Sequence, residues 1–159
     1  MINVADFARR FPSVILRNLP FGFECGDGWA EIIHEFFSAA HKALNDGKGT
    51  LHVLQVKEKM GALRISFRTA GLSQEAQRSI DEAYGLAEAR SFHVCEQCGR
   101  RGRLCCNGMW YGTLCAEHAA EADADPVFRD SGLAFRIVVG NSIALYDPRS
   151  DPFMSTRSD

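Results

Sequence analysis

Apolar residues recur at three- and four-residue steps in two long segments of the chain, which is the spacing of helices that bury one side. The first segment begins at Asp27, which can cap a helix, and ends where residues 45–47 (Asn-Asp-Gly) stop it. The second starts at Ser73, another capping residue, and continues to about Ser91. Two helices are therefore predicted. The apolar positions of the first are Trp29, Ile32, Ile33, Phe36, Phe37, Ala40 and Leu44.

Between these helices the period changes to two, which is typical of strands with one buried face. In the segment 51–56, residues 51, 53 and 55 alternate with 52, 54 and 56, and residues 63–68 alternate in the same way. This pattern predicts a β-hairpin with one apolar face. Its charged tip, Lys57, Glu58 and Lys59, is either presented to a partner or is a solvated turn.

A second hairpin is predicted near the C-terminus. Residues 133–139 and 142–146 are apolar-rich segments that flank Gly140 and Asn141, a dipeptide suited to a tight turn. Residues 148–159 are polar and have no period, so we expect them to form a loose tail.

Two pairs of metal-ligand residue types stand out, Cys95 with Cys98 and Cys115 with His118. In Cys-x-x-Cys the two thiolates reach one ion only if the backbone turns tightly, and Gly99 tolerates the positive φ of such a turn. Four ligands of these types complete a tetrahedral site, so Zn²⁺ is the predicted cofactor.

The segments around the ligands also follow recognisable patterns. Thr113 can cap a helix over residues 114–122, which would place both ligands of the second pair on its first turn. Between the pairs, Asn107 and Gly108 form a turn dipeptide typical of a two-stranded hairpin. A knuckle, a hairpin and a helix in this order predict a treble-clef-like zinc module.

Disulfides and other ligand sets are the alternatives for the six cysteines. Disulfides are disfavoured because no signal-peptide pattern is visible, and we expect a cytoplasmic compartment that keeps thiols reduced. Cys105 or Cys106 could replace a ligand, whereas His93 has the wrong spacing. Cys25 is isolated from other ligand types and is expected to be a buried structural thiol.

Together these elements predict an α+β fold, with two helices packed on β-hairpins, a treble-clef-like zinc module and a C-terminal β-hairpin. The expected organisation is a helix and hairpin core over residues 1–92, the zinc module over 93–124, the C-terminal hairpin over 125–147 and a loose tail over 148–159.

The composition limits the classes of function that the chain can have. The chain has 159 residues with 46% hydrophobic content, the size of one domain with a small appendage. A net charge of −2 does not favour nucleic-acid binding over the whole surface. The sequence has no apolar run of about 20 residues, so no membrane span is predicted.

Catalytic patterns are missing from the sequence. We find no nucleophile elbow, no phosphate-binding glycine loop and no histidine nuclease motif. A zinc ion with four protein ligands has no open position for water or substrate. We therefore expect that the protein is not an enzyme, and a zinc-dependent hydrolase or nuclease is the least favoured hypothesis.

Four motifs occur in a distinctive order: ECGDGW at residues 24–29, QVKEKMGALR at 55–64, CEQCG at 95–99 and WYGTLCAEH at 110–118. In these motifs the chain resembles a family of small, uncharacterised zinc-binding proteins of bacteriophages, prophages and bacteria. The resemblance implies a phage-type protein acting in the cytoplasm of a bacterial host cell, with no assigned reaction. It covers roughly residues 20–120, so the second hairpin lies outside it.

The leading hypothesis is a protein–protein interaction with a bacterial host protein or ribonucleoprotein complex. Inhibition of a bacterial defence complex, an anti-CRISPR-like role, is its most specific form. The alternative is a nucleic-acid-binding zinc module that uses the same side chains together with Arg90. The predicted partner-binding residues are Arg100, Arg101, Arg103, Trp110 and Tyr111.

Overall fold

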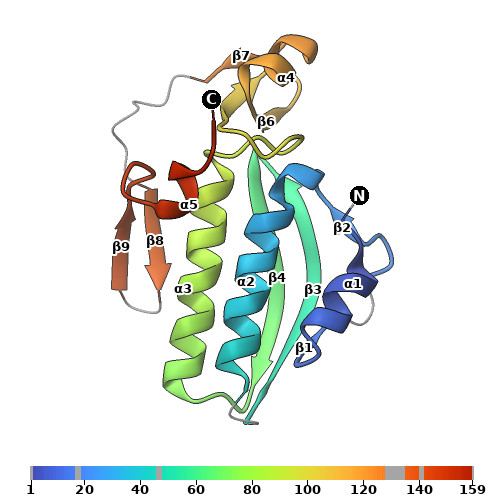
Figure 1. The fold of residues 1–159 in the computed structure, drawn as a ribbon, viewed down its shortest axis with the longest axis vertical. Coiled ribbons are helices and arrows are strands. Elements are labelled where there is room, and N and C mark those ends of the chain that lie inside the picture. The colour runs from blue at the N-terminus through green and yellow to red at the C-terminus, as the bar shows by residue number, and fades with distance from the viewer. Residues whose placement is uncertain (1, 17–18, 46–47, 128–134, 140–141, 159) are drawn as a thin grey trace.

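The protein has a mixed α+β architecture in which two helices lie side by side on one face of a sheet (Figure 1). A smaller unit that contains the cysteine pairs covers one end of these layers. The α+β class is as expected. No helix among the described residues combines the length and apolar character needed to cross a membrane. The computed structural model describes residues 2–16, 19–45, 48–127, 135–139 and 142–158.

The sheet is built around one long hairpin. Strands β3 (Thr50–Lys59) and β4 (Ala62–Ala70) pair antiparallel along their whole length, as the sequence predicts. Two short strands, β1 (Val14–Ile15) and β2 (Phe23–Glu24), pair parallel to the other edge of β3. The sequence did not predict β1 and β2, because two-residue strands leave no period to detect.

A β-bulge changes which side chains of β3 face the helices. The register shifts between Val53 and Gln55, so Leu54 is an extra residue and is 47% exposed. Leu51, Val53 and Val56 are consequently all buried. The strict alternation expected from the sequence, which put Val56 on the opposite face, is wrong because the bulge inserts one residue into the period.

The tip of this hairpin is a two-residue turn with a left-handed backbone. Met60 has φ 56° and Gly61 has φ 77°, which is the combination that a type I′ turn needs. The Glu58 carboxylate accepts a hydrogen bond of 2.6 Å from the Gly61 amide. The tip is therefore stabilised by the Glu58 side chain of β3 as well as by the turn conformation.

The two predicted helices are present. Helix α2 (Ala30–Ala43) follows a short 3-10 turn, η1 (Asp27–Trp29), and α3 (Gln74–Ser91) is capped by the Ser73 hydroxyl, which accepts from the Ala76 amide at 3.1 Å. A third helix, α1 (Val4–Arg10), was not predicted. The largest fully buried side chains of the core between helices and sheet include Trp29, Ile32, Ile33, Phe36, Phe37, Leu51, Leu63 and Ile80.

The second hairpin is confirmed in its two strands. Strands β8 (Phe135–Val139) and β9 (Ser142–Tyr146) pair antiparallel, and the hairpin lies beside α3 (Figure 1). The predicted turn residues Gly140 and Asn141 lie outside the described residues, as do residues 128–134.

The C-terminal segment is packed, so the expectation of a loose tail is wrong for residues 148–158. A short helix, α5 (Pro152–Ser155), buries Phe153 and Met154 in the main core. The guanidinium carbons of Arg90 and Arg157 lie 4.2 and 3.5 Å from the centre of the Phe153 ring. The polar composition of the segment concealed these two apolar anchors.

Arg90 holds this segment to the helices. Its guanidinium donates to both carboxylate oxygens of Asp151, at 2.7 and 2.9 Å, and to Glu35 of α2 at 2.9 Å. The hydroxyl of Tyr146 on β9 donates to the same Asp151 carboxylate at 2.8 Å. Arg90 is thus a buried structural residue, which removes it from the nucleic-acid cluster that the sequence suggested.

Asp151→Ala should lower the free energy of unfolding by about 3 kcal/mol, because it leaves the buried Arg90 charge with Glu35 alone. Urea denaturation measures this. Burial raises the pKa of Asp151, but hydrogen bonds from Arg90 and Tyr146 outweigh it, and the pKa lies below its usual range. The contribution is therefore present above about pH 4 and is lost as the pH falls through the folded-state pKa.

Asp147→Ala is the matched control. Asp147 is half-exposed and pairs with the exposed Arg149, so its loss should lower the urea midpoint much less than Asp151→Ala does. Equal destabilisation by the two substitutions would show that the Arg90–Asp151 pair has no special role.

Candidate metal centre

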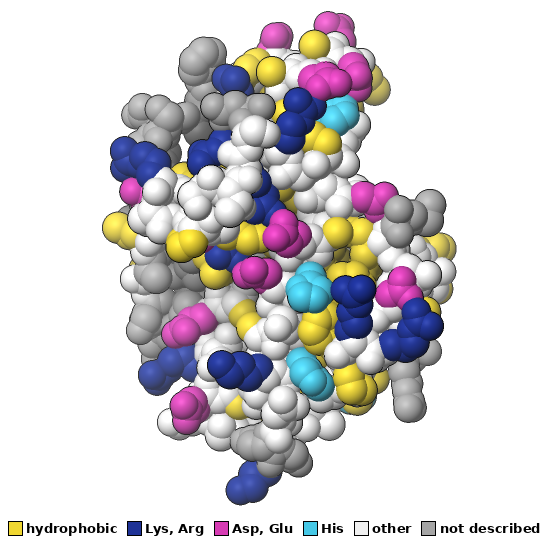
Figure 2. Space-filling view, viewed as in Figure 1, with side chains coloured by type: hydrophobic (Ala, Val, Ile, Leu, Met, Phe, Trp, Pro, Cys, Tyr) yellow, Lys and Arg dark blue, Asp and Glu magenta, His cyan; other side chains and the backbone are white. Residues whose placement is uncertain are grey.

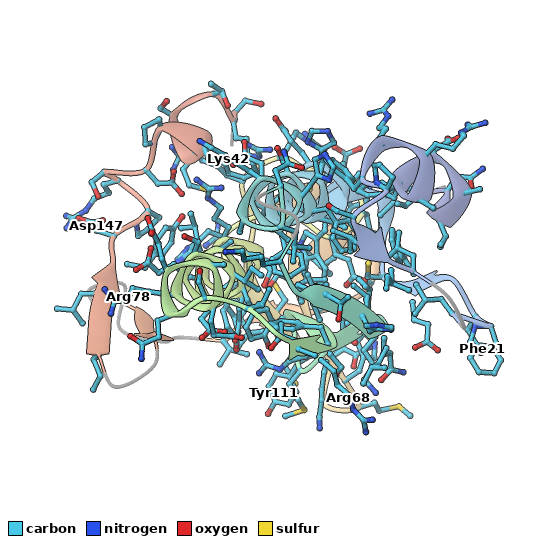
Figure 3. All side chains as sticks on the ribbon, turned by 90° about the horizontal axis from the view of Figure 1, so that it is seen from below. Phe21, Lys42, Arg68, Arg78, Tyr111 and Asp147 are labelled. Carbon is cyan, nitrogen blue, oxygen red and sulfur yellow. The ribbon has the colours of Figure 1, made fainter. Side chains whose placement is uncertain are left out.

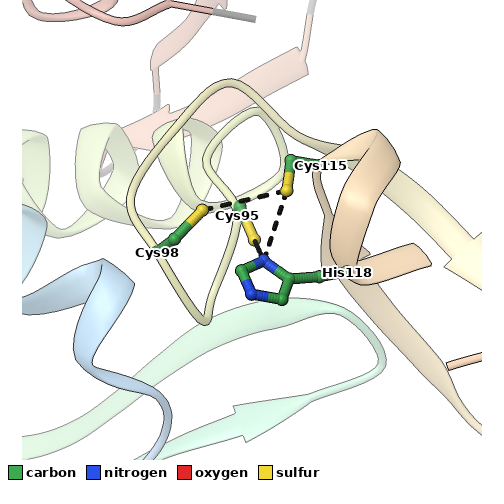
Figure 4. Close-up of side chains that lie close together, drawn as sticks. All are labelled: Cys95, Cys98, Cys115 and His118. Atoms are coloured by element: carbon green, nitrogen blue, oxygen red, sulfur yellow. Dashed lines mark hydrogen bonds between the residues drawn. The ribbon is translucent and has the colours of Figure 1, made fainter. Parts of the chain in front are cut away.

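Four side chains from two separate segments converge in the smaller unit (Figure 4). The Sγ atoms of Cys95, Cys98 and Cys115 and a ring nitrogen of His118 all lie within 4.8 Å of one another. The Nδ1 atom of His118 is 3.4 Å from Cys95 Sγ and 3.2 Å from Cys115 Sγ, and the Sγ atoms of Cys98 and Cys115 are 3.8 Å apart. This cluster can hold a metal ion.

The first pair is aimed by a tight backbone turn. The Gly99 amide donates to the Cys95 carbonyl at 2.9 Å, and Gly99 has φ 77°, as expected from its place after Cys98. The Cys95 amide in turn donates to the Arg100 carbonyl at 2.8 Å. These bonds fold residues 95–100 into the predicted knuckle.

The second pair is aimed by a hairpin and a helix. Strands β5 (Arg103–Cys106) and β6 (Tyr111–Leu114) pair antiparallel, and a two-residue strand, β7 (Asp125–Pro126), adds to β5. Helix α4 (Ala116–Glu121) follows directly. The helix begins two residues later than predicted, and Cys115 itself is the N-cap residue.

Charged side chains surround the ligands. Arg100 donates from Nε to Cys98 Sγ at 3.4 Å and from Nη2 to Cys115 Sγ at 3.6 Å, and it also pairs with Glu117. The Nε2 atom of His118 lies 3.9 Å from a carboxylate oxygen of Glu121. Arg100 therefore places positive charge beside two of the sulfur atoms, and Glu121 lies on the Nε2 side of the His118 ring, away from the Nδ1 atom that faces the thiols.

The thiols differ in how easily they ionise. Burial raises the pKa of Cys95 to about 11. Burial also opposes ionisation of Cys98, but hydrogen bonds from Arg100 outweigh it and lower the pKa of Cys98 to about 6. Three thiolates this close repel one another, so a cation is needed to keep all of them deprotonated.

The knuckle is docked on the start of α2 by direct backbone contact. The Gly28 amide donates to the Glu96 carbonyl at 2.7 Å, and the Gly26 amide donates to the Glu96 carboxylate at 2.9 Å. A Cβ atom at Gly28 would overlap the carbonyl oxygens of Cys95 and Glu96. Only glycine fits this contact, which explains why two glycines flank Asp27.

Trp29 links the same contact to the main core. Its side chain is fully buried, and its indole nitrogen donates to the Val94 carbonyl at 2.8 Å, one residue before the first ligand. The position of Cys95 is thus tied to the packing between α2 and the sheet.

The tip of the β3–β4 hairpin contacts the unit at the β5–β6 hairpin. The Thr113 hydroxyl donates to the Gly61 carbonyl at 2.6 Å, and a Cβ atom at Gly61 would overlap the Leu104 side chain. From the sequence, this tip is expected to be either a partner site or a solvated turn. Neither interpretation includes a contact within the chain.

The remaining candidate ligands lie outside the cluster. Cys105 Sγ donates to the Arg103 carbonyl at 3.4 Å, and Cys106 Sγ accepts from the Gly108 amide at 3.2 Å, so both thiols are engaged within the hairpin. His93 packs against Tyr146, with ring centres 5.9 Å apart. Cys25 is partly buried against the main core, and burial raises the pKa of its thiol to about 12.

The five predicted partner-binding residues do not form one surface of free side chains. Arg100 contacts the thiols, and Arg101 donates to the carbonyls of Met154 and Arg157, at 2.8 and 3.0 Å, which holds the C-terminal segment. Arg103 is exposed on β5. Trp110 and Tyr111 are each 38% exposed at the end of the β5–β6 hairpin, next to Met109 at 93%.

A scan of protein-family models, a search of curated proteins and a search of solved structures each returned no match to this chain. The resemblance to phage-type proteins therefore stays a prediction that rests on the four motifs.

Gly28→Ala should weaken metal binding and lower the free energy of unfolding by about 1–3 kcal/mol, because the new methyl group must push the Cys95 carbonyl away. Competition with a chelator and urea denaturation measure the two effects.

Gly108→Ala is the control. Gly108 has φ 86°, so alanine costs about 1 kcal/mol there, but its Cβ atom would meet nothing within 4 Å. Metal affinity should stay at the wild-type value. An unchanged affinity in Gly28→Ala would contradict the docking role.

Proposed function

We propose that this chain is a non-enzymatic binding protein whose smaller unit is a treble-clef-like module stabilised by Zn²⁺. The observation that carries the proposal is the complete set of four protein ligands. Tetrahedral zinc with bonds of about 2.3 Å to sulfur and about 2.0 Å to nitrogen places two sulfurs about 3.8 Å apart and sulfur and nitrogen about 3.5 Å apart. The separations of 3.8, 3.4 and 3.2 Å agree with this geometry.

A structural role for the metal follows from the size of the unit. Its own buried cluster is small and consists mainly of the thiols and alanines, so little apolar area stabilises it. Metal binding supplies folding free energy in modules of this size. With all four positions taken by protein atoms, the ion has none left for a substrate.

The hairpin end 109–111 is the best candidate for the partner contact. Met109, Trp110 and Tyr111 are adjacent, exposed and apolar, and Trp110 packs over Gly112 so that its ring is held in place. Rigid aromatic side chains that protrude from a surface are frequent anchors of protein interfaces.

The partner class follows from the motif resemblance. Proteins and ribonucleoprotein complexes of a bacterial cell, including defence complexes, are the partners to test first. The arginines expected to assist are mostly committed to contacts within the chain, which shifts the proposal from a basic surface to an apolar one.

The purified protein should contain one Zn²⁺ per chain, and Cys98→Ser should lose it together with several kcal/mol of stability. Elemental analysis and thermal denaturation measure both. A chelator should unfold the β5–β6 hairpin and α4 while the helical signal of α2 and α3 persists, because their apolar contacts do not include the ligands.

Cys106→Ser is the control, since this thiol is outside the cluster and the variant should retain its zinc. A metal-free preparation that unfolds with full cooperativity would sink the zinc assignment. Loss of all helical signal on chelation would show instead that the two units unfold as one.

Trp110→Ala with Tyr111→Ala should abolish capture of protein partners from nuclease-treated bacterial lysate, because it removes the apolar anchor. Zinc content and melting temperature should stay near wild type. Phe21→Ala is the control, since Phe21 is 79% exposed at a different edge of the molecule (Figure 3). Capture that survives the double substitution, or is lost equally in the control, would exclude this hairpin end as the contact.

A further inference from the structure

One face of the β3–β4 sheet is uncovered among the described residues. Helices α2 and α3 both lie on the other face, as the end-on view makes plain (Figures 1 and 3). We call this uncovered side the outer sheet face. By alternation from the bulge and the strand register it carries His52, Leu54, Lys57, Lys59, Arg64 and Arg68.

The outer sheet face is basic in a chain that is slightly acidic. Strands β3 and β4 contain four Lys or Arg residues and one acid, whereas the whole chain has a net charge of −2. The one acid, Glu58, is turned to the Gly61 amide, and the nearby Glu24 of β2 accepts from Gln55 at 2.7 Å. On the helix side, acidic and basic side chains are mixed (Figure 2).

The register places two basic side chains directly opposite one another. Lys57 pairs with Arg64 of β4 on one side and with Glu24 of β2 on the other, and Arg68 pairs with His52. Like charges in such pairs destabilise a hairpin. Arg64 is offset by Glu88 of α3, but Lys57, Lys59 and Arg68 form no ion pair within the described part of the chain. Lys57, Lys59 and Arg68 therefore carry charges that no ion pair among the described residues neutralises.

We propose that the outer sheet face binds a single strand of nucleic acid. A phosphate backbone would supply the negative charges that Lys57, Lys59 and Arg68 lack. The distance along β4 from Arg68 to the tip at Gly61 is about 23 Å at about 3.3 Å per residue. This length suits the lower end of the range of about 4–16 nucleotides covered by one single-strand-binding fold.

The shape of the row favours a single strand over a duplex. Neighbouring strands are about 4.8 Å apart, so the cations form one narrow row, whereas the two backbones of a duplex are separated by a groove at least about 6 Å wide. Exposed His52 and Leu54 lie within the row and offer a ring and an apolar surface to unstacked bases. An acidic protein would use the charges but not this stacking surface.

The test compares two charge reversals of equal size in the zinc-loaded full chain. Lys59→Glu with Arg68→Glu alters the outer sheet face, and Lys42→Glu with Arg78→Glu alters exposed cations on α2 and α3 (Figure 3). Binding of a fluorescent 12-nucleotide single strand of mixed sequence is measured by anisotropy at several salt concentrations, against a duplex of the same sequence and polyglutamate as competitors.

The face variant should bind at least tenfold more weakly than wild type, and the control variant should bind within twofold of it. The slope of log affinity against log salt should become shallower by about 1.4, which is about 0.7 for each lost phosphate contact. No binding by wild type, equal loss in both variants, tighter binding of the duplex or equal competition by polyglutamate would each overturn the proposal.

This inference does not depend on the proposed protein contact at residues 109–111. Trp110→Ala with Tyr111→Ala should leave the affinity for the oligonucleotide unchanged while it abolishes capture of protein. The opposite pattern, in which the face variant loses protein partners and still binds the oligonucleotide, would overturn the assignment of the outer sheet face.

Discussion

The loop that carries the first two metal ligands touches the start of α2 backbone to backbone, and the placement of the smaller unit depends on this contact. Gly26 and Gly28 lack the side chains that would separate the two segments. Trp29 then crosses from this contact into the main core, where it is fully buried. Any motion of the knuckle relative to α2 would break hydrogen bonds to Val94 and Glu96 that water cannot easily replace.

Two further contacts complete the attachment from other directions. The hairpin tip at Gly61 supports Thr113 of β6, and Arg101 binds the backbone of the C-terminal segment. The metal ligands therefore lie at the junction of three parts of the chain that are distant in sequence. A metal bound at this place would stabilise the unit itself and also preserve the surfaces through which the unit is attached.

The two proposed contact surfaces lie on different parts of this frame. The end of the β5–β6 hairpin offers rigid apolar anchors, and the outer sheet face offers a row of cations on a regular strand register. Gly61 and Gly112 bring the two surfaces next to each other at the hairpin tip. A ribonucleoprotein presents both an apolar protein surface and phosphates, so it is the partner class that the two proposals would share.

The sequence by itself determined the local features whose cause is local. Helical spacing predicted α2 and α3, turn dipeptides predicted the β5–β6 and β8–β9 hairpins, and ligand spacing with Gly99 predicted the four-residue cluster. The second strand of the β5–β6 hairpin begins at Tyr111, two residues later than the Asn107–Gly108 dipeptide indicated. Tertiary structure decided the rest, because contacts between distant segments leave no periodic signal. It determined the bulge at Leu54, the burial of Phe153 and the use of Arg101 within the chain. The sequence contained the lysines and arginines of the outer sheet face, but only the strand register showed that they share one side, since a one-residue bulge changes which face each side chain occupies.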